Sequence, residues 1–274
     1  MATAKNGDVE IYFDTFGHET DPVLLLVNGF GSQCINFKEA WCEKFAAEGF
    51  QVVRFDNRDV GLSSHLKGGL DYTLADMADD GFAVLDAVGA PKAHIAGWSM
   101  GGMIVQSMAI AHPERVLSMT SVMSSPGGTP VAAPDPEAMA VLTAPAPKTR
   151  QESIDQYVAA QHVIGSPGFF DDERLAADAA AIYDRSFDPG GRARQMAAIM
   201  QSPSRQDALK TLTIPSHVIH GDKDRLVPID AGRLTADLIP GSTFTVIEGM
   251  GHDYPPQLWD EIVGHVTKFA KSAV

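Results

Sequence analysis

One short segment has the residue types of a hydroxyl nucleophile held in a tight turn. Gly97-Trp98-Ser99-Met100-Gly101 follows an apolar run typical of a strand and precedes a run with helical spacing. Small residues at positions 97 and 101 let a strand and a helix pass close together, and the helix N-terminus favours negative charge beside the hydroxyl. We therefore predict that Ser99 is a nucleophile. The alternative is a glycine-rich turn with no catalytic role.

A serine nucleophile needs a general base. His252 lies in Gly249-Met250-Gly251-His252, directly after the last predicted strand, and is our candidate. His217 and His220 share one strand at odd spacing, so they should point to opposite faces. The remaining histidines have the surroundings of loop, helix-end or surface residues, or lie where they could at most line a pocket: His18, His65, His94, His112, His162 and His265.

The base in turn needs an acid that orients it. The loop after the preceding strand reads His220-Gly221-Asp222-Lys223-Asp224-Arg225, so Asp222 and Asp224 compete for this role. We favour Asp224, with Asp222 holding the turn together.

An attacked carbonyl develops negative charge, which backbone N–H groups can stabilise by about 2.7–4 kcal/mol each. One donor would be the amide of Met100, the residue after the nucleophile. The second would be the amide of Phe30, in the turn Asn28-Gly29-Phe30-Gly31 that follows an apolar strand. Alternatively, these glycines only permit a tight turn.

The elements that must position these residues alternate between β-rich runs and helical periodicity, which favours a parallel sheet with helices on both faces. We predict helices ending near Gly49, beginning after Thr73 and spanning 100–111, and a final helix with an apolar stripe from Trp259 to Ala270. The predicted strands are 9–16 (half of a leading hairpin), 23–27, 50–55, 93–97, 117–123, 216–220 and 242–247.

The rhythm changes between residues 124 and 205, where prolines crowd an Ala-rich stretch and no β-rich run occurs. Helical patches near 154–164, 175–183 and 193–200 predict an inserted helical cap, or lid, so that 1–123 and 206–274 form the core. Flexible methionines suit an adaptable apolar pocket, although core filling explains most of them. The residues expected to bind substrate are Gly29, Trp98, Met123, Met196, Met200 and Met250.

Composition excludes several classes of function. The chain has 274 residues, a formal charge of −14 and 45% hydrophobic residues, so it can form a large core and its surface repels nucleic acid and anionic membranes. No apolar run is long enough to span a bilayer, and no secretory signal is visible. Cys34 and Cys42 are expected to be reduced thiols, with Cys34 buried and inert, in a cytoplasmic protein. We find no metal or nucleotide motif and expect no cofactor.

The order Ser99, Asp224, His252 and the turn around Ser99 resemble the α/β-hydrolase superfamily over nearly the whole chain. Where that family usually has His-Gly-x-Gly, this chain has Asn28, which puts the usual side-chain support of that loop in doubt. Asp56 to Ser63 matches the family pattern Asp-x-Arg-Gly-x-Gly-x-Ser except at Asp59. An Asp there resembles the aclacinomycin methylesterase branch. Asp56 and Arg58 are expected to form a structural salt bridge.

The resemblance implies an α/β-hydrolase fold and hydrolysis of carboxylic esters of small to medium size through an acyl-enzyme on Ser99, His252 and Asp224. The same residues could serve enol-lactone hydrolysis, carbon–carbon bond hydrolysis or cofactor-free perhydrolysis. Outside catalysis, a small-molecule receptor with a retained triad and a silent scaffold remain alternatives. The expected partner is a small-molecule ester. Neither the acyl and alcohol groups nor the oligomeric state follows from the sequence.

Overall fold

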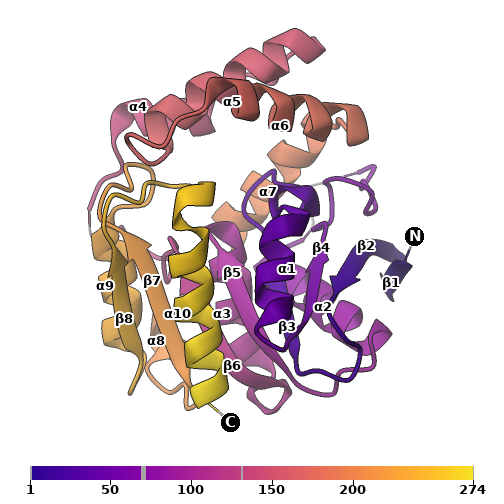
Figure 1. The fold of residues 1–274 in the computed structure, drawn as a ribbon, viewed down its shortest axis with the longest axis vertical. Helices are drawn as coiled ribbons and strands as arrows, with labels where there is room; N and C mark the ends of the chain where they lie inside the picture. Colours follow the sequence, from indigo (N-terminus) through magenta and orange to yellow (C-terminus); the bar gives the residue numbers. More distant parts are fainter. Residues whose placement is uncertain (1, 69–71, 131, 274) are drawn as a thin grey trace.

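The computed structural model describes residues 2–68, 72–130 and 132–273, and is built around one eight-stranded sheet (Figure 1). The strand order is β1-β2-β4-β3-β5-β6-β7-β8. The first two strands form the predicted hairpin and pair antiparallel, as do β2 and β4; all other neighbours are parallel. The strands are β1 (Ala2–Asn6), β2 (Val9–Phe16), β3 (Val23–Val27), β4 (Gln51–Phe55), β5 (Ala93–Trp98), β6 (Val116–Val122), β7 (Ser216–Gly221) and β8 (Thr243–Ile247).

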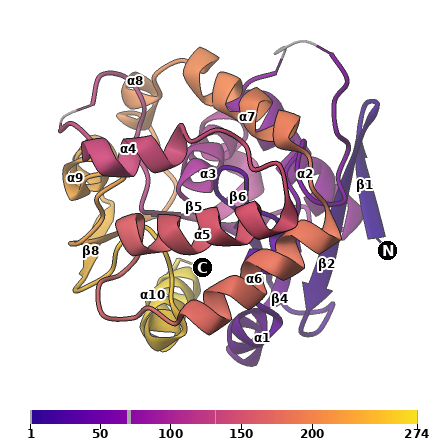
Figure 2. The ribbon, with the colours of Figure 1, turned by 90° about the horizontal axis from the view of Figure 1, so that it is seen from above.

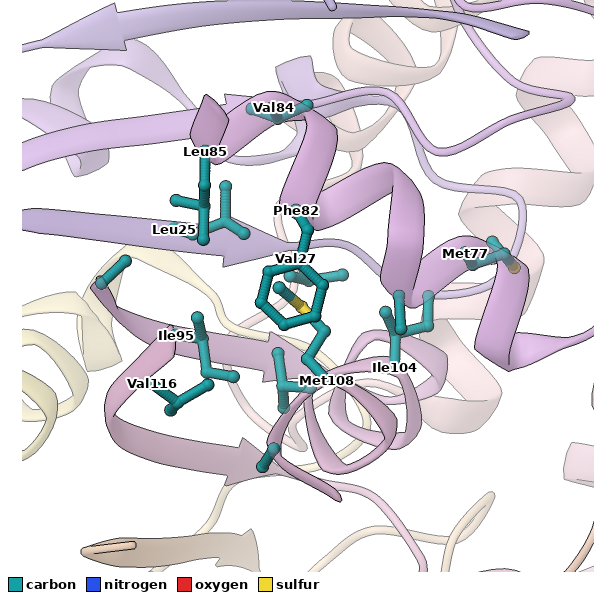
Figure 3. Close-up of a cluster of buried hydrophobic side chains, with 14 of the residues drawn as sticks. Leu25, Val27, Met77, Phe82, Val84, Leu85, Ile95, Ile104, Met108 and Val116 are labelled. Atoms are coloured by element: carbon teal, nitrogen blue, oxygen red, sulfur yellow. The ribbon is translucent and has the colours of Figure 1, made fainter. Parts of the chain in front are cut away.

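The central strand β3 explains why the sheet is covered on both faces. All five of its residues are buried and apolar, as expected for a strand inside a parallel sheet. Because side chains alternate along a strand, Leu25 and Val27 join one apolar cluster, and Leu24 and Leu26 join the other. Figure 3 shows part of the first cluster, where Leu25 and Val27 meet side chains of two helices.

The helices that cover these faces are α1 (Glu39–Ala47) and α10 (Trp259–Ser272) on one side, and α2 (Leu74–Ala87) and α3 (Met100–Ala111) on the other. Thr73 caps α2 as predicted: its hydroxyl accepts a hydrogen bond from Ala75 N. The predicted bounds of α3 agree with the structure. In α10 the expected apolar stripe is buried at its centre, whereas Trp259 and Phe269 are half-buried.

Between β6 and β7 the chain forms helices that lie above one edge of the sheet, over the carboxyl ends of its parallel strands (Figure 2). Three of them agree with the predicted helical patches, whereas the first and last helices of this segment were not foreseen. The division of the chain at residues 124 and 205 stays a prediction. These helices are α4 (Pro136–Leu142), α5 (Arg150–Ile164), α6 (Asp172–Arg185) and α7 (Pro189–Gln201); the short α8 (Gln206–Leu209) that follows them lies beside the sheet and packs against α3 and α9.

A further helix, α9 (Ile229–Leu238), connects β7 and β8 and was also missed. Its Gly232 lies against the ring of His220, where a Cβ atom would collide with the imidazole. In the described part of the chain, no helix is both long and apolar enough to cross a membrane.

Candidate active site

Ser99 lies in the sharp turn between β5 and α3. Its φ is +56°, a left-handed conformation that is uncommon for a residue with a side chain. The neighbouring glycines make this turn possible: a Cβ at Gly97 would collide with the carbonyl of Gly101, and a Cβ at Gly101 would collide with the carbonyl of Val27. The strand–turn–helix context predicted for Ser99 is therefore present.

Ser99, His252 and Asp224 form one chain of hydrogen bonds. The Ser99 Oγ lies 2.9 Å from His252 Nε2, and His252 Nδ1 lies 2.7 Å from Asp224 Oδ2. The three residues come from the ends of β5 and β7 and from the loop after β8, which the parallel sheet places at the same edge. This arrangement can move a proton from the serine hydroxyl to an imidazole that a carboxylate orients.

The structure separates the two competing aspartates. Asp224 is buried, and its Oδ1 accepts hydrogen bonds from Leu226 N (2.9 Å) and Val227 N (2.8 Å), which turns Oδ2 towards His252. Asp222 points elsewhere: its Oδ1 accepts a hydrogen bond from Gly249 N at 2.6 Å. Asp222 therefore ties together the loops that carry Asp224 and His252.

A third group touches the Asp224 carboxylate. The fully buried His220 places Nε2 3.4 Å from Asp224 Oδ2 and 2.8 Å from the Val227 carbonyl. Sequence reasoning set His220 aside; its spacing of four residues from Asp224 was the available signal. Burial alone would raise the pKa of Asp224, but the charge and hydrogen bonds of His252 and His220 lower it to about 2. The carboxylate is thus ionised at neutral pH.

In the part of the chain that the structure describes, two backbone N–H groups close to Ser99 in the fold have no hydrogen-bond acceptor. Met100 begins α3, so its N–H is one of those that have no acceptor within their own helix. Among the described residues the Phe30 N–H has no acceptor either, whereas Gly29 N donates to Asn28 Oδ1 (3.0 Å) and Gly31 N to a side chain of α7. A Cβ at Gly29 would lie 3.3 Å from the Ser99 Cβ, so this loop packs directly on Ser99.

The Asn28 side chain supports the loop that begins with it, although the sequence had left the side-chain support of this loop in doubt. Its side-chain Nδ2 donates to the Gln33 carbonyl at 2.7 Å, while its Oδ1 accepts from Gly29 N. The buried Asn28 side chain thus closes the turn by hydrogen bonds to its own loop. An amide replaces the family's usual imidazole as the loop's side-chain support.

A cavity of about 630 Å³ opens above Ser99 and His252 and lies between the sheet edge and helices α4–α7. Of the six predicted pocket residues, Gly29, Trp98 and Met123 line it. The other three do not. Met200 is 77% exposed on the outer face of α7, Met250 is fully buried in the core beneath the site, and Met196 is half-buried on α7. For Met196 and Met200, the face of α7 on which each residue lies determines whether it reaches the cavity, and the residue type alone does not reveal that face.

Hydrogen bonds link the helices above the cavity to the loops of the site. The His252 N–H donates to the carbonyl of Ile164, the last residue of α5, at 2.7 Å. From α7, Gln195 Oε1 accepts from Gly31 N (2.8 Å) and its Nε2 donates to the Arg58 carbonyl (2.8 Å). The segment over the cavity is therefore bonded to both the histidine loop and the Phe30 loop.

The expected salt bridge between Asp56 and Arg58 was wrong. Arg58 pairs with the buried Asp80 at 2.6 Å, and Asp56 pairs with Arg185 of α6 at 2.7 Å. Asp56 also accepts a hydrogen bond from Cys34 N. Although they are two residues apart in the sequence, Arg58 points towards α2 and Asp56 points towards α6 above the sheet.

His94 is a core residue and not a loop or surface residue as expected. It lies on the central strand β5, is 1% exposed and bonds through Nδ1 to Ser118 Oγ at 2.8 Å. Burial lowers the pKa of His94 to about 4. Cys34 and Cys42 are free and buried, and burial raises the pKa of both thiols. Both thiols are therefore protonated at neutral pH.

One group of side chains has the composition of a metal site. Asp59, His65 and Asp188 could bring one ligand atom each within 4.8 Å of one another. Arg194 already pairs with Asp59 (2.8 Å) and Asp188 (2.7 Å), and His65 Nδ1 lies 2.9 Å from Asp188. These contacts make the group an ion-pair network that ties α7 to the loop after β4.

A family model described as the alpha/beta hydrolase fold matches residues 22–164, more than half of the 274 residues. The chain belongs to the α/β-hydrolase fold family. It is 29% identical to rhodomycin D methylesterase DauP of Streptomyces sp. strain C5, covering 97% of this chain and 96% of that protein. It is also 29% identical to a monoacylglycerol lipase of Mycolicibacterium smegmatis, over 90% of this chain and 87% of the lipase.

Among solved structures, this α/β-hydrolase resembles the esterase RhEst1 from Rhodococcus sp. ECU1013 with a TM-score of 0.82 and 25% identity, covering 99% of this chain and 98% of that one. The predicted fold class and the resemblance to a methylesterase branch are confirmed. The relatives place the chain among enzymes, as a hydrolase of the esterase type.

Proposed function

We propose that this chain is a serine carboxylesterase that cleaves esters of small to medium size through an acyl-enzyme. The observation that carries the proposal is the continuous hydrogen-bond chain from Ser99 through His252 to Asp224 at the wall of a cavity of about 630 Å³. A cavity of that size suits a drug-sized organic molecule.

In the first half of the reaction, the Ser99 Oγ attacks the ester carbonyl while His252 Nε2 takes the hydroxyl proton. The Asp224 carboxylate holds the Nδ1–H and stabilises the positive charge that the imidazole gains. The amides of Phe30 and Met100 donate to the oxyanion, for about 2.7–4 kcal/mol each. As the intermediate collapses, His252 returns the proton to the departing alcohol, which leaves the acid bound to Ser99.

In the second half, water attacks the acyl-enzyme. His252 Nε2 removes one proton from this water, the same two amides stabilise the second tetrahedral intermediate, and the proton returns to Ser99 Oγ as the acid leaves.

The identity of the leaving alcohol follows from the relatives only as a proposal. The resemblance to a methylesterase over 97% of the chain favours a small alcohol, so that most of the cavity holds the acyl group. We further propose that residues 124–205 act as a cap over this cavity. The two buried, unpaired thiols agree with a cytoplasmic location.

The test is hydrolysis of p-nitrophenyl esters from acetate to laurate by the wild type, Ser99→Ala and Ser107→Ala. Ser107 lies on the same helix, and its hydroxyl donates to the Met103 carbonyl away from the site, so it serves as a matched control. We expect turnover by the wild type and Ser107→Ala and none by Ser99→Ala. Folded proteins that all fail on every ester would reject the proposal and favour a receptor or a lactone or carbon–carbon substrate.

A further inference from the structure

One positive charge on the cavity wall lacks a negative partner. Arg192 of α7 lines the cavity and is accessible from it. In the part of the chain that the structure describes, its guanidinium forms no ion pair and no hydrogen bond. The other basic side chains that line the cavity each have an acidic partner: Lys38 and Arg174 share Asp178, and His65 Nδ1 lies 2.9 Å from Asp188.

Arg192 is held beside the loop that stabilises the proposed oxyanion. Its Cζ lies 4.8 Å from the centre of the Phe30 ring, and its Nη1 and Cγ approach the side-chain position of Gly31 to 3.4 and 3.3 Å. Gly29, two residues before Gly31, packs on Ser99. Since consecutive Cα atoms lie about 3.8 Å apart, Gly29 and Gly31 are at most about 7.6 Å apart, so Ser99 and this guanidinium lie on the same part of the cavity wall.

The chemistry of this position selects the ligand. Desolvation in the cavity lowers the pKa of Arg192, yet a guanidinium keeps its proton in proteins. The Arg192 side chain is exposed to solvent and has no acidic partner among the described residues, so its charge is available to an incoming anion. The planar fork of N–H donors matches a carboxylate, which accepts two parallel hydrogen bonds. A single cation also balances a monoanion, whereas a phosphate dianion calls for a second positive group.

We propose that Arg192 binds a carboxylate of the substrate, so that the natural substrates are esters or lactones that also carry a free carboxylate a few bonds from the scissile carbonyl. The proposal rests on the proposed esterase activity and adds its substrate class. The protein as a whole has a formal charge of −14, which repels anions. Arg192 thus supplies a local attraction that the surface does not.

Two pairs of esters test this proposal, because the acid can lie on either side of the scissile bond. Mono-p-nitrophenyl glutarate and p-nitrophenyl pentanoate differ by a carboxylate on the acyl side. 4-Acetoxybenzoate and its methyl ester differ by a carboxylate on the alcohol side. The readout is the ratio of kcat/KM for the acidic ester to that for its neutral partner, measured for the wild type, Arg192→Gln and Arg233→Gln.

Arg233 is the matched control, since it also lies over an aromatic ring, that of Phe244, but on α9 and outside the cavity. In at least one pair, Arg192→Gln should lower the ratio by about 10- to 100-fold, the value of a charge-assisted hydrogen bond. Arg233→Gln should keep it within about twofold of the wild type. An unchanged ratio in both pairs for Arg192→Gln overturns the proposal.

A binding measurement separates this proposal from the esterase proposal. Calorimetric titration of monomethyl glutarate, which carries one carboxylate, into Ser99→Ala, with and without Arg192→Gln, needs no turnover. If the wild type hydrolyses neither these four esters nor the p-nitrophenyl esters from acetate to laurate, the esterase proposal fails. Monomethyl glutarate binding that Arg192→Gln abolishes then supports the anion site, and binding that is absent or indifferent to Arg192→Gln overturns it.

Discussion

Replacing Asp224 by asparagine tests the proposed acid with little change in shape. In the native chain, Oδ1 accepts two backbone hydrogen bonds, from Leu226 N at 2.9 Å and Val227 N at 2.8 Å. An asparagine must place its single oxygen there, because an NH₂ group cannot accept from an N–H. Its NH₂ then faces His252 Nδ1, which becomes an acceptor. The ring proton moves to Nε2, and Nε2 can no longer take the proton of Ser99.

We therefore expect Asp224→Asn to lower kcat by about 10⁴-fold, the effect of fixing the wrong histidine tautomer in a triad. Asp222→Asn should lower it by less than about tenfold, since the amide oxygen still accepts from Gly249 N, which lies 2.6 Å from the native carboxylate. The assay is steady-state hydrolysis of the best p-nitrophenyl ester, with circular dichroism to verify folding. A larger loss for Asp222→Asn, or more than a tenth of wild-type kcat in Asp224→Asn, would refute this reasoning.

The lowered pKa of Asp224 gives the same substitution a second readout. Folding lowers the pKa of this carboxylate from about 4 in the unfolded chain to about 2. The ionised carboxylate therefore stabilises the folded protein fully at pH values above about 4, and this stabilisation is lost as the pH falls towards 2. Asp224→Asn cannot titrate, so its free energy of unfolding should decline less between about pH 5 and pH 2 than that of the wild type. Urea unfolding at each pH measures this, and parallel curves would contradict it.

Two further perturbations test the packing around the site. Gly101→Ala places a Cβ against a backbone carbonyl of β3, so we expect the free energy of unfolding, measured with heat or urea, to fall by about 3 kcal/mol. The control is Gly264→Ala, at an exposed helix position with open space around its Cβ, which should raise the free energy of unfolding by up to about 1 kcal/mol. Equal effects of the two substitutions would argue against the close approach at Gly101. Cys34 and Cys42 should resist a thiol reagent in the folded protein and react on unfolding, because both are buried with raised pKa values; rapid labelling of the native protein would contradict this.

The helices predicted correctly from the sequence are those in which turn residues mark the ends and the spacing of the apolar residues matches the buried face. Helix α3 has a glycine turn before it and Pro113 after it, and its predicted bounds were right. Helix α4 has only seven residues and begins at Pro136 in a proline-rich stretch, so no helical patch was recognised there, although Asp135 caps it. Helix α9 was overlooked although it is amphipathic, because Gly232 interrupts its apolar face and is explained only by the His220 ring that it meets.

The candidate site divides in the same way. Chain order and turn chemistry are local, so they were enough to select Ser99 and His252. Which of Asp222 and Asp224 faces His252 is decided by the direction in which the loop turns each carboxylate. For Asp224, the backbone N–H groups of residues 226 and 227 fix that direction. The partners of Asp56 and Arg58 could not be predicted, because Arg185 and Asp80 approach from distant segments.

The bond from the His252 N–H to the Ile164 carbonyl has a consequence for engineering. Exchanging the segment over the cavity with that of a relative is a natural way to change substrate range. Here the exchange also replaces the acceptor that anchors the histidine backbone and, through Gln195, the acceptor for Gly31. A donor segment must therefore offer a free carbonyl and an amide at these two points, or the chimera will lose reaction rate together with its old specificity.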